Sequence, residues 1–265
     1  MKKIYYYLKL LSAVVFPIFI LYYVVFYAIF FYMIIGNTKI ATIKRNAIYT
    51  DNIEFKDDII QIMDTCMKKL ENNNISIHQK YTILFSTTID KYNRNTFYLA
   101  KGSLGNNYSM MNVLVLAPAD YKRNLQHKYD EKLFNRRLSD VIAHELTHSY
   151  LKEKMGFFKY IKMNFFGKWK NEGFCEFIAN SSSFNIEDGK RIFVENGEEQ
   201  EKLKSNKDIL AYSYFYFTSR LKTDYLLSYK KISLNEFLNT DFNETDLENE
   251  IRRSLLSKKY VFDKQ

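Results

Sequence analysis

The most constraining feature of this chain is the segment His144-Glu145-Leu146-Thr147-His148, in which two histidines stand four residues apart. On an α-helix, residues four apart lie on one face, so both histidines can offer an imidazole nitrogen to a single metal ion. Glu145 follows the first histidine directly, where its carboxylate can reach a metal-bound water and take its proton. The segment therefore predicts a helix that carries two metal ligands and a general base.

A third protein ligand must come from elsewhere in the fold, and Glu172 in the segment Asn171-Glu172-Gly173-Phe174 is the candidate. Two histidines, one glutamate and an open position distinguish a catalytic zinc site from a closed structural one. The alternative is a surface helix with two solvated histidines and a chance glutamate. The combination of the two segments is much rarer than either alone and favours the zinc site.

Together the two segments resemble the gluzincin metallopeptidases, the thermolysin and aminopeptidase N group of the peptidase MA-like superfamily. Residues 169–176 are most similar to the aminopeptidase N version, in which Asn-Glu-Gly-Phe opens the second active-site helix. The similarity covers roughly residues 138–221 and is strong only in the two motifs. It implies a zinc-dependent peptidase in which His144, His148 and Glu172 hold Zn²⁺ and Glu145 activates a zinc-bound water. No segment resembles the Gly-Ala-Met-Glu-Asn motif that binds the substrate amine in aminopeptidases.

Glu176 lies one helical turn after Glu172 and faces the same side. In thermolysin-like enzymes an acidic residue at this offset holds the first ligand histidine, so the resemblance implies that role for Glu176. A solvated helix carboxylate is the alternative. Asp140, a turn before His144, is expected to contribute to the start of its own helix.

Peptide hydrolysis also needs a donor that stabilises the oxyanion. The aminopeptidase N relatives place a tyrosine for this purpose at the start of a helix after the glutamate helix. Residues 211–217 occupy the corresponding place and contain Tyr212, Tyr214 and Tyr216. Tyr212 aligns best with the expected position, and at least one of the three tyrosines is expected simply to pack.

From Leu10 to Thr38 the chain contains no charged residue. This uncharged run is longer than the roughly 20 apolar residues that a membrane-spanning helix needs. We therefore predict a transmembrane helix over about residues 10–35, within an N-terminal anchor of residues 1–36. Lys2, Lys3 and Lys9 favour a cytosolic N-terminus, with the remaining domain on the extracytoplasmic side, although three basic residues after the run pull the other way.

Residues 37–265 are enough for one domain with its own core. The formal net charge is +9, and the basic residues are scattered. Without a groove-reading motif, this charge favours a basic surface beside anionic lipid rather than a nucleic-acid site. Cys175 follows Glu172 by three residues and is expected to be a buried thiol rather than half of a disulfide. Residues 155–169 mix aromatic residues and lysines, which favours a cleft wall or packed loop over a segment at the bilayer surface.

Hydrophobic periodicity predicts a mixed order of elements. We expect helices over residues 55–71, around His144, around Glu172, over 209–221 and over 245–256. We expect strands over residues 81–86, 96–100 and 112–117. The stretch 105–115 would supply an edge strand that binds an extended peptide by adding it to the sheet.

These features predict an α+β fold: a zincin-like metallopeptidase domain preceded by one transmembrane helix. The predicted function is hydrolysis of a peptide or protein substrate at the membrane. A non-catalytic zincin-fold binding or sensor protein is the alternative, although an intact Glu145 argues against it because that residue is not needed to hold metal. A regulatory protein that works through its membrane helix would predict no metal at all.

Overall fold

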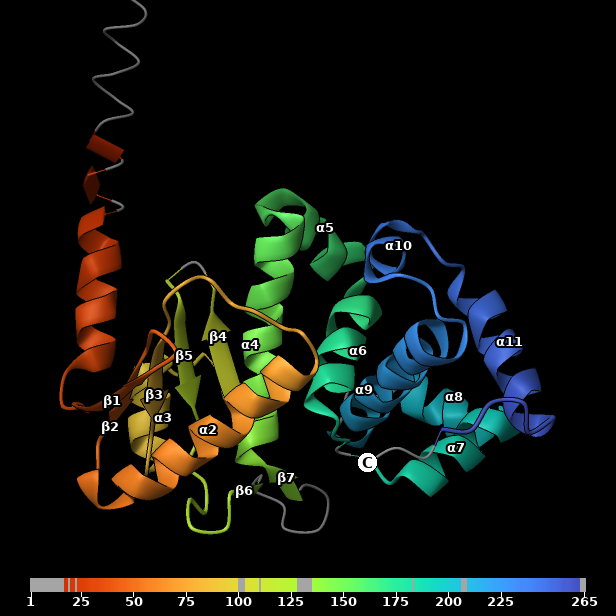
Figure 1. Ribbon diagram of the computed structural model, residues 1–265, viewed down its shortest axis with the longest axis horizontal. Coiled ribbons are helices and arrows are strands. Elements are labelled where there is room, and N and C mark those ends of the chain that lie inside the picture. The colour runs from red at the N-terminus through yellow and green to blue at the C-terminus, as the bar shows by residue number, and fades with distance from the viewer. Residues whose placement is uncertain are drawn as a thin grey trace, which may run out of the picture.

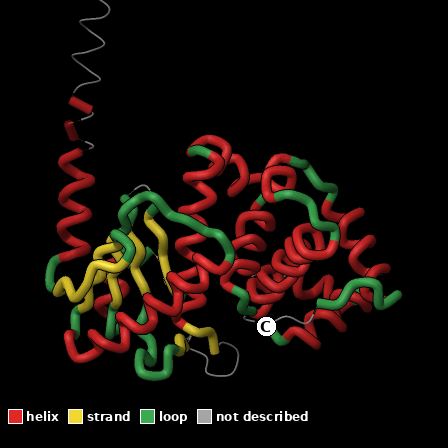
Figure 2. Tube along the Cα trace, in the orientation of Figure 1, coloured by secondary structure: helices red, strands yellow, loops and turns green. Residues whose placement is uncertain are grey.

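The computed structural model describes residues 17–18, 20–21, 23–99, 103–109, 111–127, 135–182, 184–205 and 209–262. These residues form an α+β fold in which a mixed five-stranded sheet is followed by a helical region. Figure 2 shows the strands gathered in one half of the molecule and helices filling the other.

The sheet has the strand order β1-β2-β3-β5-β4. Its strands are β1 (Thr38–Ile43), β2 (Asn46–Thr50), β3 (Thr82–Phe85), β4 (Gly105–Tyr108) and β5 (Val113–Leu116). Strands β2, β3 and β5 run parallel, and β1 and β4 pair antiparallel with their neighbours. Among the described residues, β4 therefore forms an edge of the sheet.

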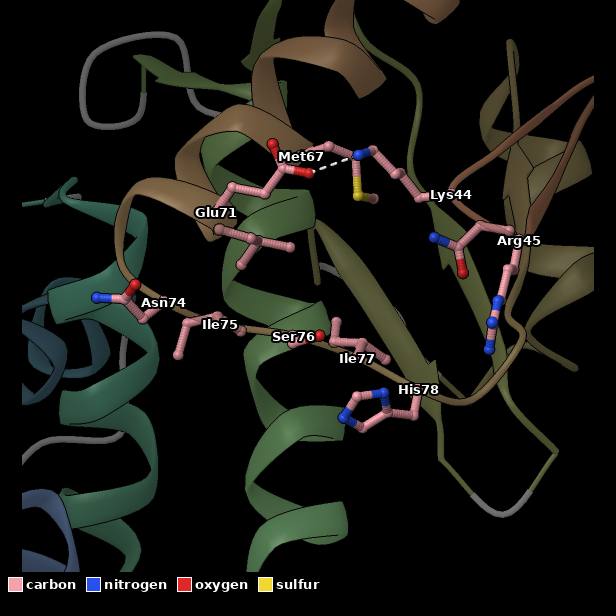
Figure 3. A pocket seen from close by; sticks show the side chains of 11 residues that line it. Lys44, Arg45, Met67, Glu71, Asn74, Ile75, Ser76, Ile77 and His78 are labelled. Atoms are coloured by element: carbon pink, nitrogen blue, oxygen red, sulfur yellow. Dashed lines mark ion pairs between the residues drawn. The ribbon is translucent and has the colours of Figure 1, made fainter.

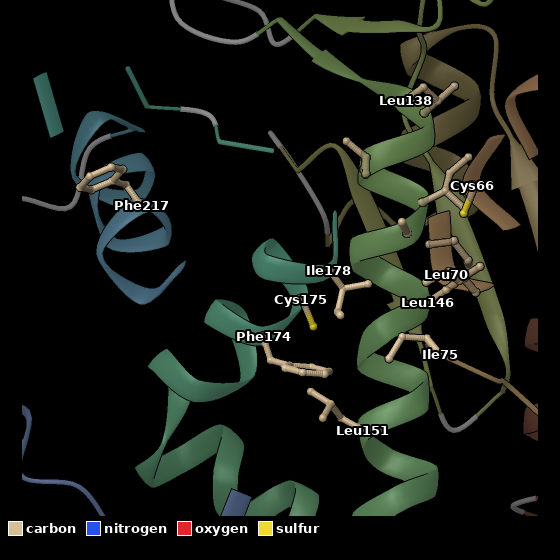
Figure 4. Packing of buried hydrophobic residues seen from close by; sticks show 14 of the residues in the cluster. Cys66, Leu70, Ile75, Leu138, Leu146, Leu151, Phe174, Cys175, Ile178 and Phe217 are labelled. Carbon is tan, nitrogen blue, oxygen red and sulfur yellow. The ribbon is translucent and has the colours of Figure 1, made fainter. Parts of the chain in front are cut away.

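Both faces of the sheet are covered, which explains why β5 is an uninterrupted apolar run. Leu114 and Leu116 point into the main core with α2 (Lys56–Asn72). Val113 and Val115 point the other way, against Tyr92 of α3 (Ile89–Asn95) and Met33. Figure 4 shows side chains from α2, α4 (Leu138–Met155) and α6 (Lys168–Ala179) meeting in the main core.

Figure 1 shows α4 standing between the sheet and the helical region. Among the described residues, the remaining elements after the sheet are a small pair of strands, six α-helices and one π-helix. They are β6 (Leu125–His127), β7 (Asn135–Arg137), α5 (Phe157–Phe166), α7 (Ile186–Glu195), α8 (Glu198–Ser205), α9 (Ile209–Asp224), the π-helix η2 (Tyr225–Tyr229), α10 (Leu234–Asn239) and α11 (Glu244–Leu256).

Helices α6 and α9 approach each other very closely at Gly173. A Cβ atom at this position would lie 2.3 Å from the backbone oxygen of Ser219 and 2.4 Å from Oγ1 of Thr223. Only a glycine allows the two backbones to pack at this distance. Gly173 therefore sets how near α9 comes to the helix that carries Glu172.

Most of the predicted elements are present. Residues 55–71, 209–221 and 245–256 correspond to α2, α9 and α11, and residues 81–86 and 112–117 to β3 and β5. The prediction of a strand over residues 96–100 is wrong for residues 96–99, the part that the structure describes. Thr88 caps α3, and Phe97 and Tyr98 that follow this helix have φ angles of 52° and 59°, a left-handed conformation that a strand excludes.

The described part of the N-terminal segment is helical over residues 23–34 and packs its end on the sheet through Met33, Ile29 and Phe30. Residues 10–16, 19 and 22 of the predicted transmembrane helix lie outside the described residues. In the described ranges, no helix combines the length and apolar character that crossing a membrane requires.

Candidate metal centre

Helices α4 and α6 bring the two histidines and Glu172 together. Nε2 of His144 lies 3.2 Å from Nε2 of His148. Oε2 of Glu172 lies 3.3 Å from the first of these nitrogens and 3.5 Å from the second. Three atoms with available lone pairs therefore converge on one point between the two helices.

The outer nitrogens of both imidazoles are held by neighbouring side chains. Nδ1 of His144 lies 2.8 Å from Oε1 of Glu176, and the same oxygen accepts a hydrogen bond of 2.9 Å from Nη2 of Arg136. Nδ1 of His148 lies 3.0 Å from Oδ1 of Asn171, which can only accept. An acceptor oxygen beside each Nδ1 favours the tautomer that carries its proton there, which leaves each Nε2 free to act as a ligand.

Cys175 lies beside the same histidines. His144, His148 and Cys175 form a buried group that could hold a metal ion, with one ligand atom of each within 4.8 Å of the others. Its Sγ atom lies 3.2 Å from Nδ1 of His148. Both cysteines are buried and free, which confirms the expectation of a thiol at Cys175.

The negative charge of the site favours a positive charge between the imidazoles. Burial lowers the pKa of His144, but hydrogen bonds and charges from Glu172 and Glu176 outweigh burial and raise it to about 10. Burial raises the pKa of the Glu172 carboxyl, and the two imidazoles, His148 first, outweigh burial and bring it well below its ordinary value. Two nearly buried carboxylates therefore face the imidazoles and stabilise a cation between them.

Glu145 points toward the edge strand β4. A Cβ atom at Gly105 would lie 3.2 Å from Cγ and 3.6 Å from Oε1 of Glu145. Asn107, two residues further along β4, donates hydrogen bonds of 2.6 Å to the backbone oxygen of Glu145 and 2.9 Å to Oγ of Ser149. The strand thus passes directly beside the glutamate that follows the first histidine.

The three tyrosines of α9 have three different surroundings. The ring of Tyr216 packs edge-on against His144, with 6.0 Å between the ring centroids. Tyr214 is buried, and its hydroxyl accepts a hydrogen bond from Gln200. Tyr212 is 51% exposed and lines a separate hollow with Lys168, whose ammonium lies over its ring. The structure brings Tyr216 to the histidines and leaves Tyr212 one turn away.

The charge of Glu172 and burial raise the pKa of Tyr216 well above its usual value, so its phenol stays protonated. Asp140 lies in the first turn of α4, where it pairs with Lys69 of α2. Its place in the first turn agrees with the expected contribution to the start of α4, and its ion pair with Lys69 also joins α4 to α2.

Four residues of this region make contacts that sequence reasoning did not predict: Arg136, Asn171, Gly173 and Tyr216. Asn171 and Gly173 belong to the second motif, so their position next to Glu172 in the sequence could have indicated that they contribute to the site. Arg136 is 40 residues from Glu176, and no local pattern links the two residues.

A surface hollow of about 570 Å³ lies apart from this centre, between the β1–β2 turn and the end of α2. Figure 3 shows it with His78 and with the ion pair between Lys44 and Glu71, whose atoms are 2.8 Å apart. None of the residues that line it belongs to the metal centre.

Compared with known proteins, the chain matches no family model and no curated protein. The geometry of the site itself therefore has to support any functional assignment.

Proposed function

We propose that this protein is a membrane-anchored zinc metallopeptidase of gluzincin type with a zincin-like catalytic domain. In this proposal His144, His148 and Glu172 hold Zn²⁺, and Glu145 is the general base. The observation that carries the proposal is the convergence of the two Nε2 atoms and Oε2 of Glu172, at separations of 3.2, 3.3 and 3.5 Å.

These separations fit a tetrahedral zinc ion. Zinc binds imidazole nitrogen and carboxylate oxygen at about 2.0–2.2 Å, so two ligand atoms of a regular tetrahedron lie about 3.3–3.5 Å apart. The three measured separations lie close to that range. The carboxylate of Glu172 also supplies the negative charge that a divalent ion favours in a buried site.

Glu172 is a better third ligand than Cys175 because of the side of the imidazole on which each residue lies. Cys175 contacts Nδ1 of His148, whereas Nε2 of that ring faces His144 and Glu172. The two nitrogens of one imidazole point away from each other and cannot bind the same ion. A thiolate ligand at Cys175 would require His148 to turn and to lose its contact with Asn171.

The groups around the ligands support a hydrolytic role. When bound, zinc lowers the pKa of a coordinated water molecule and polarises a carbonyl group. Glu145 would take the proton of the attacking water and pass it to the leaving amine. Strand β4 offers an edge beside Glu145, where an extended peptide can pair with the sheet.

Tyr216 replaces Tyr212 as the proposed oxyanion donor. A donor must reach the oxygen of the reacting carbonyl near the metal. The Tyr216 ring contacts His144, whereas Tyr212 is exposed and contacts Lys168 one helical turn away. The raised pKa of Tyr216 keeps a proton on its phenol oxygen for donation.

The membrane part of the proposal rests on the sequence. We propose that the apolar run over residues 10–35 anchors the chain, with the catalytic domain on the extracytoplasmic side. Carbonate washing of membranes and protease treatment of intact cells test the anchor and its orientation separately. Digestion of the domain only after lysis would reverse the orientation.

The enzymatic proposal is tested on the purified full chain by elemental analysis and by cleavage of a peptide library, with Glu145→Gln as the matched variant. We expect close to one zinc per chain in both proteins and loss of most turnover in the variant, because an amide cannot accept the proton of water. Zinc without cleavage by the parent protein would support the alternative, a non-catalytic binding or sensor protein. A chain without metal would contradict both.

A further inference from the structure

Helix α5 exposes four phenylalanines to solvent. Phe158 is 86% exposed, Phe166 84% and Phe165 77%, and Phe157 is 44% exposed. Large aromatic side chains normally contribute to a core or an interface, and a cluster of exposed ones marks a surface that binds something. These four residues lie at the two ends of a single ten-residue helix.

The fold holds these side chains outward. The opposite side of α5 is anchored by Tyr160 and Met163, which are buried in the main core. Asn164 accepts a hydrogen bond from Asn171 of α6. Since these contacts set the rotation of α5, its phenylalanines cannot turn inward without breaking the packing of the helix.

The charged residues of α5 and of its flanks in the sequence all have one sign. From residue 154 to residue 171 the sequence contains five lysines and no acidic residue. Lys159 and Lys162 are exposed on α5 itself, and Lys154 and Lys168 are exposed just beyond its ends. Exposed aromatic residues interleaved with lysines are typical of a helix that lies in the headgroup layer of an anionic bilayer.

The position of α5 is consistent with such a surface. Figure 1 shows α5 at the same edge of the molecule toward which the helix of residues 23–34 rises from the sheet. That helix also exposes apolar side chains, with Tyr27 63% and Phe31 69% exposed. Asp241 and Glu244 line a hollow together with Phe166. Both lie outside α5, in the loop after α10 and at the start of α11, where Glu244 pairs with Lys222.

We propose that α5 is a second membrane contact, which inserts its phenylalanines into the interfacial layer of an anionic bilayer while its lysines meet the lipid headgroups. Lipid fits this surface better than a protein partner, because the phenylalanines form two pairs at opposite ends of α5 with exposed lysines between them. Of these four rings, all within the described residues, only those of Phe157 and Phe158 are in contact, with centroids 5.6 Å apart. The contact is distinct from the N-terminal anchor.

This contact would hold the metal centre close to the bilayer surface. Helix α5 connects α4 to α6, the two helices that carry the histidines and Glu172. Asn171 donates a hydrogen bond to Asn164 and accepts one from Nδ1 of His148, which links α5 to the centre itself. If the proposed peptidase function holds, chain segments adjacent to the membrane are the substrates that such a placement favours.

The lipid contact is tested without reference to catalysis. Phe158→Cys and Phe166→Cys variants of the full chain are labelled with the fluorophore NBD, since the native cysteines are buried. Glu201→Cys on α8, an exposed position away from α5, is the matched control. The proteins are reconstituted into phosphatidylcholine vesicles with and without phosphatidylglycerol, each carrying a lipid with a shallow spin label.

We expect the spin label to quench NBD at positions 158 and 166 at least about twice as strongly as at position 201, because only α5 enters the headgroup layer. Equal quenching at all three positions would overturn the proposal. A blue-shifted NBD spectrum without quenching would also overturn it, because another protein chain rather than lipid would then cover α5.

The anionic preference has its own test. Lys159→Glu with Lys162→Glu should reduce quenching at position 158 in vesicles that contain phosphatidylglycerol and leave it unchanged in pure phosphatidylcholine. The control pair Lys258→Glu and Lys259→Glu makes the same change of charge at exposed positions after α11. An equal effect of the two pairs would contradict a role for the α5 lysines.

Discussion

Nδ1 of His144 on α4 lies 2.8 Å from Oε1 of Glu176 on α6, and both side chains are buried. Arg136 donates a hydrogen bond to the same carboxylate oxygen. The carboxylate therefore orients the imidazole with its Nε2 toward Glu172, and the guanidinium balances its charge. This arrangement ties the first proposed ligand to two residues outside the proposed ligand set.

Glu176→Gln should weaken zinc binding without abolishing it. An amide can accept the hydrogen bond from Nδ1 but lacks the charge that makes the imidazole a stronger donor, so we expect a loss of about 10- to 100-fold in affinity. Competition with a zinc chelator measures the change. Glu187→Gln, on an exposed side chain of α7, is the control. Unchanged affinity in Glu176→Gln would remove the positioning role.

Glu172→Ala and Cys175→Ala should separate the two candidate third ligands. We expect Glu172→Ala to lose its zinc, because one of three protein ligands disappears. Cys175→Ala should keep close to one zinc per chain, because its thiol faces the outer nitrogen of His148. Elemental analysis of both purified variants decides the matter, and the reverse pattern would assign the third ligand to Cys175.

Tyr216→Phe should lower turnover by about a hundredfold or more while the Michaelis constant changes little, because an oxyanion donor acts mainly in the transition state. Tyr212→Phe should be close to silent, since this side chain is half exposed and lies one turn away. Steady-state kinetics with a peptide substrate measure both. A large loss in Tyr212→Phe alone would favour Tyr212, the tyrosine that the sequence pattern predicts.

Gly105→Val should impair catalysis without removing the metal. A Cβ atom at position 105 would lie 3.2 Å from Cγ of Glu145, so the valine side chain would crowd this glutamate. It would also obstruct the edge of β4. Displacement of a catalytic group typically costs on the order of tenfold to a hundredfold in rate. Zinc content and turnover are measured together, with Gly197→Val as the control because its surroundings are open. Full activity would place the substrate elsewhere.

Gly173→Ala should destabilise the domain. The new methyl group would collide with the backbone of Ser219, which cannot move aside as a flexible side chain can. Overpacking of this kind costs about 1–3 kcal/mol or more, and α9 would have to shift with Tyr216. Chemical denaturation measures the free energy of unfolding, again against a Gly197 variant. An unchanged midpoint would mean that α6 and α9 separate easily.

Local patterns in the sequence predicted much of the order of elements. The alternation of apolar and charged residues over 55–71 predicted α2, and the apolar run before Pro118 predicted β5. The strand predicted over residues 96–100 failed because Thr88 caps a helix just before it and the chain then turns through two left-handed residues. Strands β1 and β2 were missed because their residues carry no clear alternation. They join the sheet only because β2 pairs with β3 and β1 pairs with β2.

Sequence alone marked most of the residues of the candidate centre. Residues four apart lie on the same face of any α-helix, which places His144 with His148 and Glu172 with Glu176. Such spacings depend on local helix geometry and not on how the helices pack. They are therefore enough to mark the histidines, Glu145 and the glutamate helix as candidates.

Only the tertiary structure decided which side chains meet these residues. The rotation of α9 against α6, set by the contact at Gly173, brings Tyr216 rather than Tyr212 to His144. The packing of α4 on α6 joins Arg136 to Glu176 and directs Cys175 to the outer side of His148. In α5, burial of Tyr160 and Met163 leaves Phe158 and Phe166 in solvent. The rotation of a helix about its axis depends on which face gains most from burial against its neighbours, and that free energy arises from contacts between residues far apart in the chain.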